Sequence, residues 1–208
     1  MTRDETLDRS AIDAMLRLAA ELGWRGLSLD DIAHAADVPM SVLRARFPCK
    51  ARVLLAYARQ VETDAGAQPA PFDESDTTRD RLFELLMQRL DLLAPARAGV
   101  AGILRDLPRD PLSIVAMAPE ATRLLAGVLE AAGVSAGGPA GLLRCKGLAA
   151  IWFRTLMVWS EDDSPDSART MAALDRFLRQ SEPAANFLAA LPFSGPVASP
   201  GMASGGPG

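Results

Sequence analysis

The sequence predicts an all-α protein, with a small three-helix domain at the N-terminus and a larger helical domain after it. Its 208 residues are 49% hydrophobic, contain a single Tyr and have few runs of β-branched residues, a composition that favours helices. Apolar residues recur along most of the chain at the spacing of a helix with one buried face. Clusters of Pro and Gly divide these stretches into segments of ordinary helix length.

The first helix is expected over residues 9–22, after a polar arm at residues 1–8. Gly23 should end this helix, since glycine readily takes the left-handed conformation that follows a helix C-terminus. Trp24 and Leu27 are then expected to close the core of the small domain. The apolar face of the first helix consists of Ile12, Met15, Leu16, Leu18 and Ala19.

Residues 29–50 predict a helix-turn-helix followed by the start of another helix, and the rest of the chain is organised around them. Ser28, Asp30 and Asp31 favour a helix start, because a side-chain oxygen accepts an unpaired backbone N–H and carboxylates suit the positive end of the helix dipole. Asp37 falls at the turn, and Asp is among the few residues that tolerate a left-handed backbone.

The second helix of the motif is expected over residues 39–46. Proline cannot donate a backbone hydrogen bond and is best placed at a helix start, which suits Pro39. Val38 and Leu43 should face the first helix of the motif. The residues left for the outer face are Ser41, Arg44 and Arg46.

A local run of positive charge accompanies this outer face. Residues 38–61 include no acidic residue, although the whole chain has a formal net charge of −4. Neutralisation of phosphates supplies most of the affinity of DNA-binding proteins, and a short helix with basic and hydroxyl groups fits the major groove. A solvated helical hairpin that only packs within an all-α domain is the alternative. The basic residues of this run are Arg44, Arg46, Lys50, Arg52 and Arg59.

The stretch GWRGLSLDDIAHAADVPMSVLRARFPCKARVLL (residues 23–55) resembles the N-terminal domain of TetR-family transcriptional regulators. The residues that match the family pattern are Gly23, Ser28, Ile32, Ala33, Ala36, Val38, Leu43, Phe47, Lys50 and Leu54. The resemblance implies that the outer face contacts DNA. The residues that we expect to do so are Ser28, Pro39, Met40, Ser41, Arg44, Arg46, Phe47 and Lys50.

The sequence departs from the family pattern at three positions. Asp37 stands where the family has a turn glycine, and this exchange is sterically tolerable. Arg44 replaces the usual Tyr, and its guanidinium can still bind phosphate. Cys49 replaces the usual Ser and removes an N-cap for the next helix, although Pro48 and Lys50 keep the boundary.

A domain boundary is expected after the connecting helix of residues 50–64. Residues 65–77 contain Gly and Pro residues that exclude a helix there. We therefore expect a helix-turn-helix domain with its connecting helix over 1–64 and a helical effector and dimerisation domain over 76–193. The tail 194–208 is rich in Gly, Pro and Ser and is predicted to be disordered.

The second half of the chain predicts a series of helices. Pro119 should divide one helical region, because proline is tolerated in a first turn but not in a helix interior. Residues 133–141 are expected to form a loop. The predicted helices are 78–93, 97–107, 111–117, 119–132, 140–160, 165–181 and 183–193.

Catalytic and metal chemistry have little support. His34 is the only histidine, and Cys49 and Cys145 are distant in sequence, so no zinc site, metal site or disulfide framework can be assembled. We expect neither an enzyme nor a cofactor. The most apolar stretch, residues 147–159, is too short to span a bilayer and contains Arg154, so we expect no stable membrane insertion and a cytoplasmic protein.

The apolar second half suggests a small, mainly apolar ligand. Residues 152–159 carry apolar side chains around more than one helix face, which suits either a buried core helix or a cavity wall. Arg154 could anchor an acidic ligand in such a cavity, and the alternative is that it extends to the surface. The expected ligand-binding residues are Leu86, Met117, Trp152, Arg154 and Met157.

The two helices of residues 140–181 are expected to form a homodimer as a four-helix bundle with a second copy. In the TetR family, the last two long helices make the dimer and the variable helical domain binds the inducer, and both expectations agree with that resemblance. The expected dimer stripe is Ala168, Met171, Leu174, Phe177 and Leu178.

A second resemblance leaves an alternative open. Residues 154–182 resemble the C-terminal part of the ubiquinone-biosynthesis accessory proteins that share the TetR fold. Those proteins bind lipid or quinone without binding DNA, and their basic recognition face has largely been lost. Because that face is present here, we expect a regulator, with repression as its expected mode, that binds double-stranded operator DNA and responds to a small apolar effector.

Overall fold

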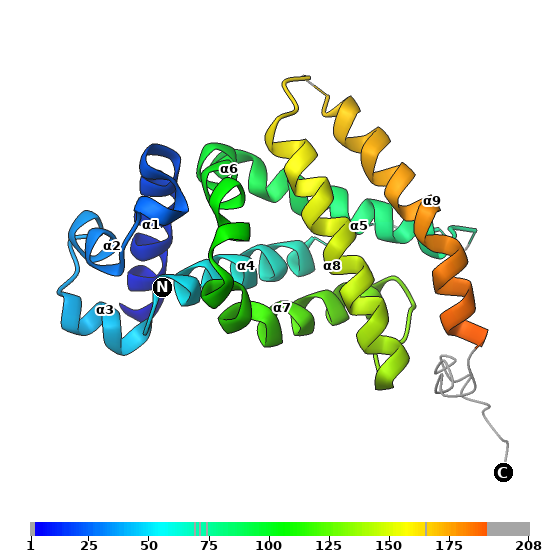
Figure 1. The fold of residues 1–208 in the computed structure, drawn as a ribbon, viewed down its shortest axis with the longest axis horizontal. Coiled ribbons are helices and arrows are strands. Elements are labelled where there is room, and N and C mark those ends of the chain that lie inside the picture. The colour runs from blue at the N-terminus through cyan, green and yellow to red at the C-terminus, as the bar shows by residue number, and fades with distance from the viewer. Residues whose placement is uncertain (1–2, 69, 71, 74, 165, 191–208) are drawn as a thin grey trace, which may run out of the picture.

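The computed structural model describes residues 3–68, 70, 72–73, 75–164 and 166–190. This part of the chain is helical and has no strand, which confirms the all-α prediction. Figure 1 shows α1 to α3 at one end of an elongated molecule, with α8 and α9 at the other. The helices are α1 (Arg3–Gly26), α2 (Leu29–Ala35), α3 (Met40–Arg46), α4 (Lys50–Ala67), α5 (Thr78–Leu93), α6 (Arg97–Asp106), α7 (Pro111–Ala131), α8 (Gly138–Ser160) and α9 (Ala168–Ala190).

The N-terminal elements form largely as their local sequence signals predict. Gly23 interrupts α1 with a φ of 71°, and Asp37 turns the chain between α2 and α3 with a φ of 53°. Ser28 caps α2 by accepting from the Asp31 backbone N–H at 3.1 Å. The predicted polar arm is wrong from Arg3 onward, because α1 already includes these residues and acidic side chains in its first turn suit the helix dipole.

The predicted break at Pro119 is also wrong. α7 continues through this proline for 21 residues. Proline in a helix interior deprives the carbonyl four residues earlier of its partner, and here that carbonyl belongs to Val115, whose residue is 71% exposed. Water can therefore satisfy the carbonyl that Pro119 leaves unpaired.

The uninterrupted α7 is the one helix in the described part that is long and apolar enough to cross a membrane by length and composition. Only 17% of its most apolar eighteen residues are buried. The predicted helices 111–117 and 119–132 divide this apolar stretch at Pro119, whereas the structure joins them in one helix.

The C-terminal half agrees with most of its predicted boundaries. Thr77 caps α5 with Asp80, and α5 and α6 end within a residue of expectation. α9 continues through Pro183 to Ala190, where two separate helices were expected. The predicted tail at residues 194–208 lies outside the described residues.

One apolar core connects the two halves of the chain. Trp24 of the N-terminal domain and Trp159 of α8 belong to the same buried cluster, together with α4 and α6 side chains. α6 lies directly against α1, because a Cβ atom at Gly99 or Gly102 would collide with the α1 backbone. The apolar core is therefore continuous across the predicted domain boundary between residues 64 and 76.

A second buried cluster joins α5, α7, α8 and α9. Leu86 and Leu174 are completely buried in it. Trp152 is half-buried and packs against both clusters, so it lies where the two cores meet.

Candidate nucleic-acid interface

The outer side of α3 forms an exposed face at one end of the molecule. Leu43 points inward and is completely buried, and this fixes which side of the short helix meets solvent. Ser41 and Arg44 are exposed on that side, and Met40 is half-buried. We call this surface the recognition face and define it by Ser28, Pro39, Met40, Ser41, Arg44 and Arg46.

The two arginines of the recognition face differ in their partners. Among the described residues Arg44 has no ion pair and no side-chain hydrogen bond, so its guanidinium is available to a ligand. Arg46 instead donates to Asp8 of α1 through Nε at 2.8 Å and through its terminal nitrogen at 2.6 Å. This bidentate bond to Asp8 raises the pKa of Arg46 above its ordinary value.

Phe47 and Lys50 do not belong to the exposed surface, which corrects their predicted place in it. Phe47 is 4% exposed and packs in the core. The Lys50 ammonium lies 4.7 Å from the centre of the Trp24 ring and donates to the carbonyls of Trp24 and Leu27 at 2.6 and 2.8 Å. Burial lowers the pKa of Lys50, and the nearby carboxylates of Asp110 and Asp106 oppose this shift. Both side chains therefore support the motif from inside.

The surroundings of Lys50 form a polar junction between the helix-turn-helix and the start of α7. The Trp24 indole donates from Nε1 to Oδ2 of Asp110 at 2.9 Å, and the Arg25 backbone N–H donates to Asp106 at 3.1 Å. Asp110 also accepts from the Ser113 backbone N–H and hydroxyl, and these hydrogen bonds hold its pKa below the usual value. The junction consists of Trp24, Lys50, Asp106 and Asp110.

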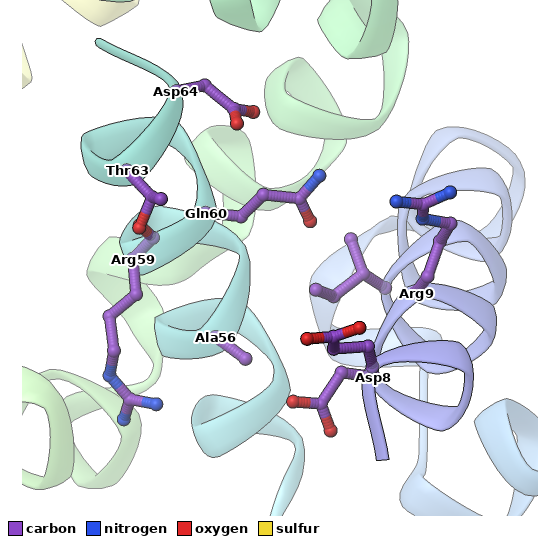
Figure 2. A pocket seen from close by; sticks show the side chains of 9 residues that line it. Asp8, Arg9, Ala56, Arg59, Gln60, Thr63 and Asp64 are labelled. Atoms are coloured by element: carbon purple, nitrogen blue, oxygen red, sulfur yellow. The ribbon is translucent and has the colours of Figure 1, made fainter. Parts of the chain in front are cut away.

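A groove of about 380 Å³ lies between α1 and α4, beside the Arg46–Asp8 pair. Figure 2 shows that Asp8 and Arg9 come from α1, while Gln60 and Asp64 extend from α4 toward it. Its lining is rich in charged and polar side chains. This groove does not suit the mainly apolar ligand that the sequence analysis expected.

The predicted ligand-binding residues are distributed over both cores. Met117 and Met157 contribute to the first cluster, Leu86 to the second, and Trp152 to both. Arg154 is exposed, and its guanidinium lies 4.1 Å from the centre of the Phe177 ring. Arg154 therefore fits the alternative that it extends to the surface. Stacking on the Phe177 ring covers the aliphatic part of its side chain and leaves the guanidinium near water.

The predicted dimer stripe needs a correction. Leu174, Phe177 and Leu178 are at most 5% exposed because α9 packs them against its own chain. Ala168 is exposed and Met171 is half-buried, so these two remain accessible to a second copy.

Asp162 is a buried structural residue in the connection between α8 and α9. It is 1% exposed and accepts hydrogen bonds from the backbone N–H and hydroxyl groups of Ser164 and Thr170. These four donors hold the pKa of Asp162 well below its usual range. The hydroxyl residues two and eight positions after Asp162 are the sequence signal that could have indicated a capped turn.

Comparison with known proteins gives a consistent fold. No protein-family model matches the sequence, and neither does any curated protein at the threshold of significance. Among solved structures, a TetR transcriptional regulator from Nitrosomonas europaea ATCC 19718 is 26% identical, with a TM-score of 0.60 over 84% of this chain and 97% of that one. A TetR transcriptional regulator from Rhodococcus sp. RHA1 is 16% identical, with a TM-score of 0.63 over 86% of this chain and 97% of that one.

A TetR-family transcriptional regulator from Streptomyces coelicolor is also similar. It is 16% identical, with a TM-score of 0.50 over 96% of this chain and 94% of that one. These likenesses extend over both halves of the chain, so they concern the whole helical arrangement as well as the helix-turn-helix.

Proposed function

We propose that this chain, which has the TetR fold, is a DNA-binding transcriptional regulator that acts as a cytoplasmic homodimer. The observation that carries the proposal is the recognition face, where Arg44 is exposed beside Ser41 on α3 and has no partner in the described part of the chain. The structural neighbours named above are transcriptional regulators, which fits the expectation that the chain is not an enzyme. Repression is the proposed mode of action.

The proposed DNA contacts combine positioning and base reading. Arg44 offers a bidentate donor for a phosphate or a guanine, and Ser41 offers a hydroxyl group. The Ser28 hydroxyl donates to Asp31, so it would contact DNA only by exchanging this partner for a phosphate. Met40 and Pro39 offer apolar contacts at the start of the helix. Arg46 contributes only after it exchanges Asp8 for a phosphate. Its net contribution to the free energy of DNA binding is therefore smaller than that of Arg44.

A palindromic operator requires two recognition faces separated by about 34–36 Å or a multiple of this distance. We propose that the exposed sides of α8 and α9 supply the dimer surface, because Leu143 is 52% exposed and Gly147 and Ala150 lie at helical spacing from it. Ala168 and Met171 extend this surface onto α9. The small residues would allow a close approach of the helices.

The proposed effector is small and mainly apolar. We place its site around Trp152, where the two cores meet, with Leu86, Met117 and Met157 as side chains that these cores would contribute. A ligand there that prefers one spacing of the recognition faces changes DNA affinity by linkage. Arg154 is left out of this site because it stacks on Phe177 at the surface.

Fluorescence anisotropy with labelled duplexes from the DNA flanking the coding region tests the proposal. The wild-type protein should bind one duplex specifically, with an affinity that falls as salt rises. Arg44→Ala should weaken binding, while Arg179→Ala, which removes an exposed arginine on α9, should not. Absence of specific binding at low salt, or equal binding by Arg44→Ala, would contradict the proposal. The lipid-accessory alternative is not favoured, because the proteins that residues 154–182 resemble have largely lost the basic recognition face, and this chain retains it.

A further inference from the structure

The first half of α7 is the most exposed apolar surface among the described residues. Seven of the nine residues 111–119 are exposed, and all seven are Pro, Leu, Ile, Val or Ala. Leu112 is 82% exposed, Val115 71% and Ile114 42%. Ser113 and Met117 are the two that point inward. We call the seven exposed side chains the α7 face.

The helix that carries this face is fixed at both ends. At its start Asp110 accepts from Trp24 and Ser113, and near its middle Glu120 pairs with Arg59 of α4 at 3.0 Å. In its second half Val128 and Leu129 are buried in the core. The α7 face can therefore lie on an apolar phase, but the helix cannot cross a bilayer without unfolding the protein around it.

Charges around the α7 face are arranged with the cations outward. Arg105, Arg109 and Arg123 are exposed. The nearest carboxylates in sequence, those of Asp106 and Asp110, are half-buried and accept from the Arg25 backbone N–H and the Trp24 indole of α1.

Glu120, the remaining carboxylate beside the face, lies between two arginines. Arg59 and Arg123 both approach it. Its negative charge is therefore compensated. Among the described residues Arg105 and Arg109 pair with no carboxylate, so the rim of the α7 face keeps an excess of positive charge, although the whole chain carries a net charge of −4.

We propose that the α7 face docks on the surface of a lipid bilayer that contains anionic headgroups. Apolar side chains inserted among acyl chains, with arginines at the level of the headgroups, form the standard arrangement of an interfacial helix. A partner helix would cover one narrow stripe, whereas here the exposed residues extend over most of the circumference of the helix. A fluid apolar phase can cover such a convex surface without a matching groove.

The test is flotation of the full-length protein with vesicles. Vesicles of equal parts phosphatidylglycerol and phosphatidylcholine should carry the protein upward, vesicles of phosphatidylcholine alone should carry much less, and high salt should reduce the bound fraction. The double substitution Leu112→Glu and Val115→Glu should lower the partition coefficient by more than about tenfold. Arg105→Gln and Arg109→Gln should each lower it by about fivefold.

Leu22→Glu is the matched control, because Leu22 is a 52% exposed leucine on α1 and is not part of the α7 face. This variant should bind vesicles like the wild type, and circular dichroism should give the same helical signal for all variants. The proposal is overturned if the wild type ignores anionic vesicles, if neutral vesicles bind equally well, or if the double variant retains binding. A change in sedimentation of the double variant, without vesicle binding by the wild type, would assign the face to a second copy instead. None of these outcomes depends on whether the protein binds DNA.

Discussion

Trp24 and Asp110 are separated by 86 residues in sequence and joined by a hydrogen bond of 2.9 Å from the indole to the carboxylate. Asp110 also caps α7, so the same side chain starts an effector-domain helix and holds the helix-turn-helix domain. The Lys50 ammonium lies over the Trp24 ring, and besides the hydrogen bonds from Ser113 its positive charge is close enough to Asp110 to lower the pKa of that carboxyl. The position of the recognition face thus depends on residues on both sides of the predicted domain boundary.

Asp110→Ala should lower the free energy of unfolding by about 1–2 kcal/mol, because it removes an N-cap and leaves the Trp24 indole without its acceptor. Thermal denaturation followed by circular dichroism measures this change. Asp91→Ala is the control. Asp91 is exposed on α5, so its replacement should have little effect on the free energy of unfolding. Equal midpoints for the two variants would mean that the junction is not stabilising.

Asp8→Asn should increase affinity for operator DNA by a few-fold, because it weakens the ion pair that Arg46 must break before it contacts a phosphate. Arg44→Ala should decrease affinity and reduce the slope of log K against log salt by about one. Anisotropy titrations at several salt concentrations measure both. If Asp8→Asn weakens binding as Arg44→Ala does, then Asp8 positions Arg46 for DNA and does not compete for it.

Glu62→Ala should destabilise the protein by about 2–3 kcal/mol, because Arg89 is 7% exposed and would keep a buried charge without its carboxylate partner. The two side chains form a double hydrogen bond between α4 and α5, at 2.8 and 2.6 Å. The paired substitution Glu62→Met with Arg89→Met should recover much of this loss. Urea denaturation of the three proteins gives the comparison, and a double variant as unstable as Glu62→Ala would refute the electrostatic explanation.

Asp162→Asn should cost about 2–3 kcal/mol at neutral pH, because an amide cannot accept from all four donors that surround this carboxylate. The folded protein holds the pKa of Asp162 below its unfolded value, so the stabilisation is present above about pH 4 and is lost as pH falls through the folded pKa. The difference in stability between wild type and Asp162→Asn should therefore narrow in acid. A difference that stays constant down to pH 2 would contradict this account.

Local signals explain what could be predicted from the sequence. The cap of α2 by Ser28, the left-handed turn at Asp37 and the end of the first straight segment at Gly23 all depend on residues within one turn of each other. Such features are determined by short-range sterics and hydrogen bonds. The start of α5 after Thr77 belongs to the same class.

Features that depend on distant residues were missed or misplaced. From the sequence, an apolar stripe on α9 could pack either against its own chain or against a second copy. In the structure Leu174 of this stripe is buried by its own chain. Lys50 at the start of α4 was predicted to contact DNA, because the sequence does not reveal that the fold brings the Trp24 carbonyl within hydrogen-bond distance of its ammonium. Pro119 predicts a helix end from sequence, because the exposure of Val115 cannot be known before the fold is known.

The bare contact between α1 and α6 has a consequence for how the protein opens. At Gly99 and Gly102 the two backbones meet without a layer of side chains between them, so water cannot enter between the helices while either is in place. Amide hydrogens of α1 and α6 should then exchange with solvent in one shared opening event, at a free energy close to that of complete unfolding. α1, on which the helix-turn-helix packs, would belong to the most slowly exchanging unit of the molecule, and a melting curve would have a single transition.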